Sequence, residues 1–242
     1  MTLISASDAA SSDNYGGNLR NPDNHSADIT HKENTSIYLD RLPPTLDYPQ
    51  LLAGLRNTGY IKQCHINGPN ASNPMSSNAK VVFFTHADAQ KVIDLDLNDN
   101  LMIAGVRPRT GWNRIRVPED PAAGRSRSLR IRGPTHLVNQ VALEEFWTKA
   151  SIYWNTKCVQ EIGEVGNGDS VVWYTFGSWR CQSAAAKRAL EVKYGGAIKI
   201  WYRKDPCAPK EFRAPRDSGA PSQAAVLRSR KVLRSGGFLR SL

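Results

Sequence analysis

The sequence has few cysteines, and none of them lies at the spacing of a metal-binding motif. Cys64, Cys158, Cys181 and Cys207 are far apart along the chain, and no histidine cluster accompanies them. This pattern disfavours both a zinc site and a disulfide framework. We therefore expect reduced thiols, no metal or other cofactor, and an intracellular protein that is nuclear or cytoplasmic.

Long apolar runs and catalytic motifs are also missing. No stretch approaches the roughly 20 apolar residues that a membrane-spanning helix needs. The N-terminal residues lack the basic start and apolar core of a secretory signal, so we expect no membrane partner. Phosphate-binding loops and hydrolase motifs are absent, and the five histidines have no motif-spaced Asp, Ser or Cys partners. We therefore expect no catalysis.

The net charge is close to zero where the sequence has regular hydrophobic patterns. Residues 36–106 carry a net charge of −1 and residues 133–202 a net charge of +1, although the whole chain has +10. Residues 107–132 contain eight arginines and two acidic residues, and residues 203–242 carry ten basic and three acidic residues. Because guanidinium groups bind phosphate bidentately, this distribution favours nucleic acid over charge that serves only solubility.

One pattern of strands and helices occurs twice. The first copy has strands at 36–42, 60–66 and 78–85, helices at 47–57 and 88–95, and a closing strand within 102–117. The second has strands at 129–134, 157–165, 170–176 and 198–202, with one helix at 138–151 and a last helix capped by Ser178. The order β-α-β-β-α-β predicts an α+β chain with two ferredoxin-like domains, at 35–117 and 127–203. Residues 118–126 would link them, and Ser-, Pro- or Gly-rich tails at 1–34 and 204–242 would be disordered.

Two strands in each copy resemble the hexamer and octamer motifs of the RNA-recognition motif (RRM) family. Ile37-Tyr38-Leu39 and Leu129-Arg130-Ile131 fit the hexamer, whereas residues 79–83 and 169–176 fit the octamer. The arrangement as a whole is similar to fungal two-RRM proteins, chiefly at residues 42–44, 79–84 and 176–182. The resemblance implies two sheets, each with an open face on which aromatic side chains stack unpaired bases.

Each copy departs from the family pattern. Only Tyr38 and Trp173 remain of the usual stacking aromatics, and Arg130 stands where the hexamer usually has an aromatic residue. An arginine can nevertheless stack on a base as well as pair with phosphate. With the arginines of the Arg-rich segment 107–132 included, the predicted RNA-binding residues are Tyr38, Asn78, Lys80, Arg107, Arg109, Arg114, Arg116, Arg130, Arg132, Val171 and Trp173.

The residues therefore favour a non-catalytic protein that binds single-stranded RNA. The alternative is a protein-interaction module, which would use degenerate sheet faces or the helix that carries Phe146 and Trp147. Tyr38 would then be a half-buried strand residue, and Trp173 would lie beneath a covering helix or the C-terminal segment. What occupies the faces that hold Tyr38 and Trp173 distinguishes the two hypotheses.

Overall fold

The computed structural model describes residues 25–71, 73–120, 124–152, 154, 156–164 and 167–210. Residues up to Pro209 belong to one compact unit. The disorder predicted for residues 1–24 and 211–242 lies outside the described residues.

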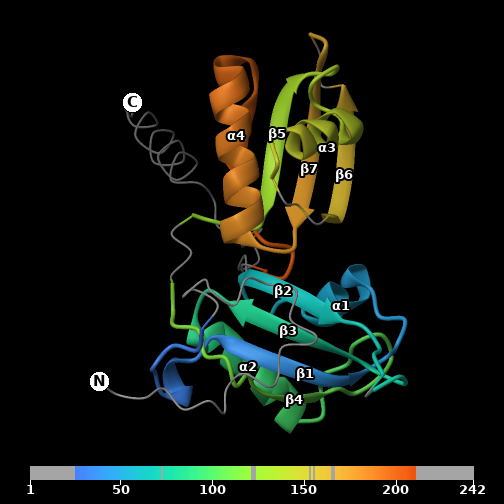
Figure 1. Cartoon of the computed structure of the whole chain (residues 1–242), viewed down its shortest axis with the longest axis vertical. Helices are drawn as coiled ribbons and strands as arrows, with labels where there is room; N and C mark the ends of the chain where they lie inside the picture. Colours follow the sequence, from blue (N-terminus) through green and yellow to red (C-terminus); the bar gives the residue numbers. More distant parts are fainter. Residues whose placement is uncertain are drawn as a thin grey trace, which may run out of the picture. The chain divides into compact units, whose positions relative to one another are not determined.

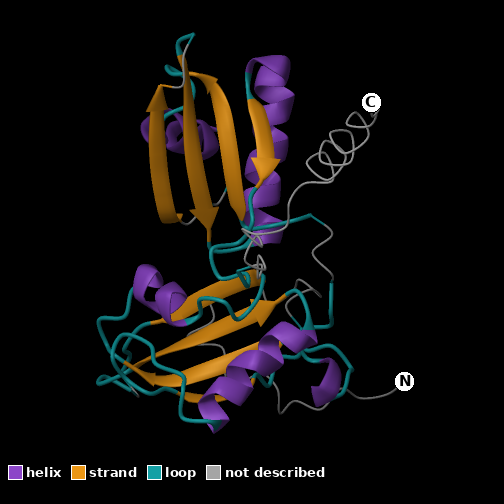
Figure 2. Ribbon diagram, turned by 180° about the vertical axis from the view of Figure 1, so that it is seen from behind, coloured by secondary structure: helices purple, strands orange, loops and turns teal. Residues whose placement is uncertain are grey.

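The first half of the chain forms a four-stranded antiparallel sheet with two helices on one face (Figures 1 and 2). Its elements are β1 (Ser36–Leu42), α1 (Tyr48–Gly54), β2 (Ile61–Asn67), β3 (Ser77–Phe83), α2 (His86–Leu97) and β4 (Arg109–Trp112). The strand order is β2-β3-β1-β4, which places the hexamer and octamer strands at the centre. The predicted split βαβ fold is confirmed here.

The second half repeats this topology. Its elements are β5 (Ser128–Pro134), α3 (Gln140–Lys149), β6 (Thr156–Glu164), β7 (Asp169–Phe176), η4 (Trp179–Ser183), α4 (Ala184–Tyr194), η5 (Gly195–Ala197) and β8 (Lys199–Tyr202). The strand order is β6-β7-β5-β8, and all three pairings are antiparallel. The α+β class with two ferredoxin-like sheets is thus confirmed for both halves.

Local sequence explains where most helices begin. Asp47 caps α1 by accepting a 2.8 Å hydrogen bond from the backbone N–H of Gln50, and Thr85 caps α2 by accepting one from Asp88. Ser178, the predicted cap of the last helix, makes no capping hydrogen bond. The chain instead passes through the π-helical turn η4 before α4 begins, so that prediction was wrong.

Alternation along the strands builds two separate cores. In the first sheet, Ile37, Leu39 and Phe83 are fully buried against the helices. In the second, the ring of Trp147 lies 4.8 Å from that of Tyr174 and 5.2 Å from that of Phe176, measured between centroids. These edge-to-face contacts favour the observed geometry beyond simple burial. Among the described residues, no helix packs on the opposite face of either sheet.

Two segments predicted to be disordered make defined contacts instead. Near the N-terminus, the side-chain amide of the buried Asn34 donates a 3.1 Å hydrogen bond to the carbonyl of Asn113. After β8, Asp205 forms a fully buried ion pair with Arg127, with Nε and Oδ2 2.7 Å apart. Cys207 follows and is buried in the core of the first sheet. Asn34, Asp205 and Cys207 lie in segments whose composition is typical of disordered tails. Each of them is nevertheless buried and contacts a residue that is distant in sequence.

Candidate nucleic-acid interface

Trp173, Arg130 and Trp201 form a row across the open face of the second sheet. Trp173 of β7 lies opposite Arg130 of β5, and Arg130 lies opposite Trp201 of β8. Their strand neighbours Val172 and Ile200 are buried on the helix side, so alternation directs the row to the other face. Figure 2 views the second sheet from this open face. Trp201 is 44% exposed.

Guanidinium groups lie over both indole rings of this row. The Cζ atom of Arg203 lies 3.5 Å from the ring centroid of Trp173, and that of Arg130 lies 5.4 Å from the ring centroid of Trp201. Cation–π attraction stabilises such pairs, and it orients the charge next to the aromatic surface. The segment after β8 thus partly covers Trp173, as the alternative hypothesis expected, but it does so with a cation that can itself stack on a base.

A second row beside this one consists of Val171, Arg132 and Lys199. Arg132 pairs with Asp169, with 3.1 Å between Nε and Oδ2, and Lys199 is exposed. Val171 is only 2% exposed, so its side chain offers almost no contact surface. This row therefore contributes cations beside the tryptophans rather than a further stacking surface. The burial of Val171 does not support the role in RNA binding that was predicted for it.

On the first sheet, Tyr38 lies between Lys80 of β3 and Gly111 of β4. Tyr38 is 36% exposed. A Cβ atom added at Gly111 would have no heavy atom within 4 Å, which leaves one flank of the tyrosine open. A cavity of about 280 Å³ lies there, lined by Tyr38, Asp40, Arg109, Thr110, Gly111 and Trp112. The ring can therefore be approached by a flat ligand from the β4 side.

Burial alters the ionisation of two residues on this face. It raises the pKa of the Tyr38 phenol, and the carboxylate of Asp40 adds to the effect. It lowers the pKa of the Lys80 ammonium, because the charged form loses hydration. Tyr38 is therefore a neutral hydroxyl donor near pH 7, and an anion bound beside Lys80 would offset the cost of its partly desolvated charge. Asn78 accepts a 2.7 Å hydrogen bond from the side chain of Asn67.

The predicted RNA-binding arginines between residues 107 and 116 do not act as one group. The guanidinium of Arg107 pairs with Asp96 and Asp99, and that of Arg116 donates to the backbone carbonyl of Ile29. Arg109 and Arg114 are exposed. Arg107 and Arg116 thus contribute to the fold of the first half, whereas Arg109 and Arg114 present their charge to solvent.

Sequence reasoning missed three residues of these surfaces, namely Trp201, Arg203 and Arg41. Trp201 could have been found, because the alternation Ile200-Trp201-Tyr202 in the predicted last strand directs the tryptophan outward. Arg203 was expected at the very end of the second domain, after its last predicted strand, with no role in binding; its backbone N–H continues the ladder by donating to Ser128. Arg41 lies at an irregularity of β1 that the sequence does not reveal.

The described residues contain neither a candidate metal site nor a candidate membrane-spanning helix. Across the residues that the structure describes, no three His, Cys, Asp or Glu side chains gather in a way that could hold a metal ion. Over the same part of the chain, every helix is too short or too polar to cross a bilayer.

Neither a protein-family model nor a curated protein matches the sequence. Among solved structures, similarity is found to RNA recognition domains 1 and 2 of Sex-lethal from Drosophila melanogaster, with 17% identity over 70% of this chain and 100% of that one and a TM-score of 0.28. The first two RRM domains of the yeast poly(U) binding protein share 15% identity over 70% of this chain and 99% of theirs, also at 0.28. The RNA-binding domain of Hrp1, solved in complex with RNA, shares 11% identity over 71% of this chain and 98% of that one, with a TM-score of 0.27.

These TM-scores are too low to carry an argument. The assignment of each half to the RRM-type fold rests instead on the strand orders β2-β3-β1-β4 and β6-β7-β5-β8 with two helices per sheet. On that topology, the chain has two ferredoxin-like β-α-β-β-α-β halves, an arrangement that RRM domains share.

Proposed function

We propose that this protein binds single-stranded RNA without catalysing a reaction, and that the second sheet makes the principal base contacts. The row Trp173–Arg130–Trp201, with Arg203 over the first indole, is the observation that supports this proposal. Stacking on aromatic rings tolerates any base, and the adjacent cations attract the phosphates. Two rings separated by one strand suit two bases of an extended strand rather than one enclosed ligand.

A protein ligand fits this face less well. The open face of the second sheet carries Arg130, Arg132, Lys199 and Arg203 beside its tryptophans. A groove for an apolar peptide segment would instead bury charge, which is costly without matched partners. Single-stranded RNA supplies flat rings and regularly spaced negative charges together.

Titration of the full chain with random-sequence single-stranded RNA tests the proposal. Trp201→Ala should weaken binding about five- to 150-fold, because loss of one stacked base costs roughly 1–3 kcal/mol. Val192→Ala is the matched control, since Val192 is 80% exposed on α4, on the helix side. The fold of both variants is checked by thermal unfolding.

Unchanged RNA affinity in a folded Trp201→Ala protein would contradict the proposal. If Trp173→Ala unfolds the second sheet while RNA affinity per folded molecule persists, Trp173 is a structural residue beneath Arg203. The protein-interaction alternative would then be favoured.

A further inference from the structure

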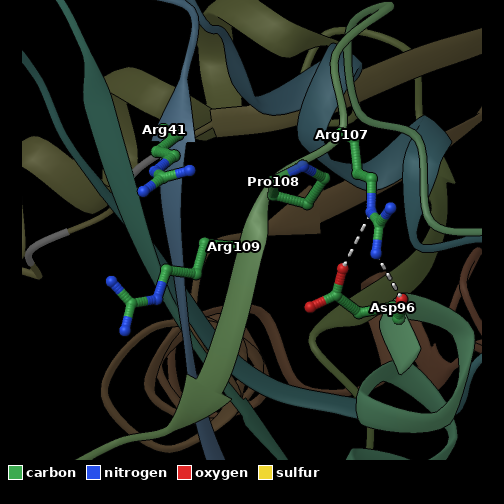
Figure 3. A pocket seen from close by; sticks show the side chains of 5 residues that line it. All are labelled: Arg41, Asp96, Arg107, Pro108 and Arg109. Atoms are coloured by element: carbon green, nitrogen blue, oxygen red, sulfur yellow. Dashed lines mark hydrogen bonds and ion pairs between the residues drawn. The ribbon is translucent and has the colours of Figure 1, made fainter. Parts of the chain in front are cut away.

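A cavity at the edge of the first sheet is lined by three arginines. Arg41, Arg107 and Arg109 line a space of about 310 Å³ together with Asp96 and Pro108 (Figure 3). We propose that this cavity binds a backbone phosphate of the RNA strand that passes over Tyr38. The inference rests on the proposed RNA-binding function and adds a defined phosphate site to it.

The three guanidinium groups differ in what they contact. Arg107 points to Asp96, with 3.7 Å between Nε and Oδ1, and Asp96 also accepts a 3.0 Å hydrogen bond from the backbone N–H of Thr110. Both carboxylate oxygens of Asp96 are thus engaged. Figure 3 shows Arg41 and Arg109 on the other side of Pro108, away from this pair. Within the described part of the chain, no ion pair or hydrogen bond is found for either guanidinium group. Two exposed cations therefore line one cavity without a carboxylate that neutralises them.

The backbone of β1 is deformed at Arg41. The pairing of β1 with β3 shifts register between Leu39 and Leu42, and Arg41 has a φ of 60°. Positive φ costs free energy for a residue with a long side chain, and bulges change the direction of side chains. Without the shift, alternation from the buried Leu39 would turn Arg41 toward the helices. With it, Asp40 and Arg41 both avoid the core while Leu42 is buried again.

Arg109 connects this cavity to the one beside Tyr38. It lines both spaces, and it lies two residues before Gly111 on β4, which is about 7 Å along a strand. That spacing is close to the length of one nucleotide in an extended strand. Asp40 faces Arg109 across the strand pair and lines the Tyr38 cavity, but the two residues form no ion pair in the described structure. A base on Tyr38 would therefore place its neighbouring phosphate between Arg109 and Arg41.

The salt dependence of RNA binding tests this assignment. For single strands, the slope of log K against log salt falls by about 0.7 for each phosphate contact that is lost. The Arg41→Gln/Arg109→Gln double variant should reduce the slope by about 0.7, because the two side chains hold one phosphate, and each single variant should reduce it by no more than that. Arg56→Gln, an exposed arginine that follows α1, is the matched control and should leave the slope unchanged.

Three results would overturn the assignment. A slope loss of about 1.4 in the double variant would show two independent, diffuse contacts, and an unchanged slope in that variant would show that the cavity is not used. Saturable binding of inorganic phosphate at micromolar concentration would show a small-molecule site instead of a strand contact. The proposed function is judged separately: if Trp201→Ala weakens RNA binding while the Arg41 and Arg109 variants behave as Arg56→Gln does, only the phosphate site is wrong.

Discussion

The two open sheet faces share one topology but differ in chemistry. The first presents a single tyrosine beside Lys80, with Asp40 and the side-chain-free Gly111 next to it. The second presents two tryptophans interleaved with arginines. Because the strand orders are equivalent, the backbone does not account for this difference. The difference in chemistry follows from the residue types at a few outward-facing positions. These residues place most of the aromatic stacking surface on the second sheet. The open face of the first sheet has smaller aromatic and electrostatic contributions to binding.

Both faces belong to one compact unit, and loss of the buried Arg127–Asp205 pair should disturb that unit most strongly. Asp205→Ala should destabilise the protein by about 3–5 kcal/mol, because Arg127 would keep a buried charge without its partner. The carboxylate of Asp205 also accepts a 2.8 Å hydrogen bond from the backbone N–H of Cys207, whose thiol lies in the first core. Both sheets should therefore lose stability.

Chemical denaturation followed by amide signals from each sheet measures this effect. Asp28→Ala provides the control, since Asp28 is exposed and a substitution there should change the free energy of unfolding by less than about 0.5 kcal/mol. Loss of stability confined to the second sheet would show that the two halves unfold independently. Burial raises the pKa of the Cys207 thiol to about 12, so this thiol should also stay unreactive toward alkylation at pH 8 while the exposed Cys181 reacts.

One pair of variants tests which of the two open faces contributes more to RNA affinity. Trp201→Ala should weaken RNA binding more than Tyr38→Ala, because the indole is larger, is 44% exposed and lies beside Arg130. We expect roughly 1–3 kcal/mol for the tryptophan and about 1 kcal/mol or less for the tyrosine. Equilibrium titration of both folded variants at one salt concentration gives the comparison. A larger loss for Tyr38→Ala would reverse the assignment of the principal face.

The sequence predicts most of this arrangement, for reasons that are local. Hydrophobic patterns identify seven of the eight strands, and they place the closing strand of the first copy only within residues 102–117, because Pro108 and Gly111 interrupt the pattern. Alternation and the family resemblance together place Tyr38, Arg130 and Trp173 on the open faces. The same rule, applied to the last strand, would have included Trp201.

What could not be predicted depends on contacts between distant residues. Arg127 and Asp205 are 78 positions apart, and only the folded chain shows that each has a partner. The outward position of Arg41 depends on a register shift that no residue type marks. Arg107 and Arg116 also have distant partners that the sequence does not show: Asp96 pairs with Arg107, and the backbone carbonyl of Ile29 accepts from Arg116.

The open flank of Tyr38 provides a way to test the first sheet without removing its aromatic ring. In Gly111→Val, a β-branched side chain would fill the cavity beside Tyr38, and the strand should accept it because no atom lies within 4 Å of the added Cβ. RNA affinity should fall by as much as in Tyr38→Ala, about 1 kcal/mol or less. The double variant should show no additional loss, because both changes remove the same stacked base. Additive losses would indicate that Tyr38 binds from its other side, next to Lys80.

The smallest effect should come from the arginine that covers Trp173. Arg203→Lys keeps the positive charge but removes the planar group that lies 3.5 Å from the indole centroid. If a base continues the stack on the outer surface of this guanidinium, RNA affinity should fall by roughly 0.5–1 kcal/mol, the magnitude of an exposed cation–π contact. The slope of affinity against salt should not change, because the number of positive charges is the same. A changed slope with unchanged affinity at low salt would mean that Arg203 contacts phosphate only, and Trp173 would then contribute little to the base contacts of the second sheet.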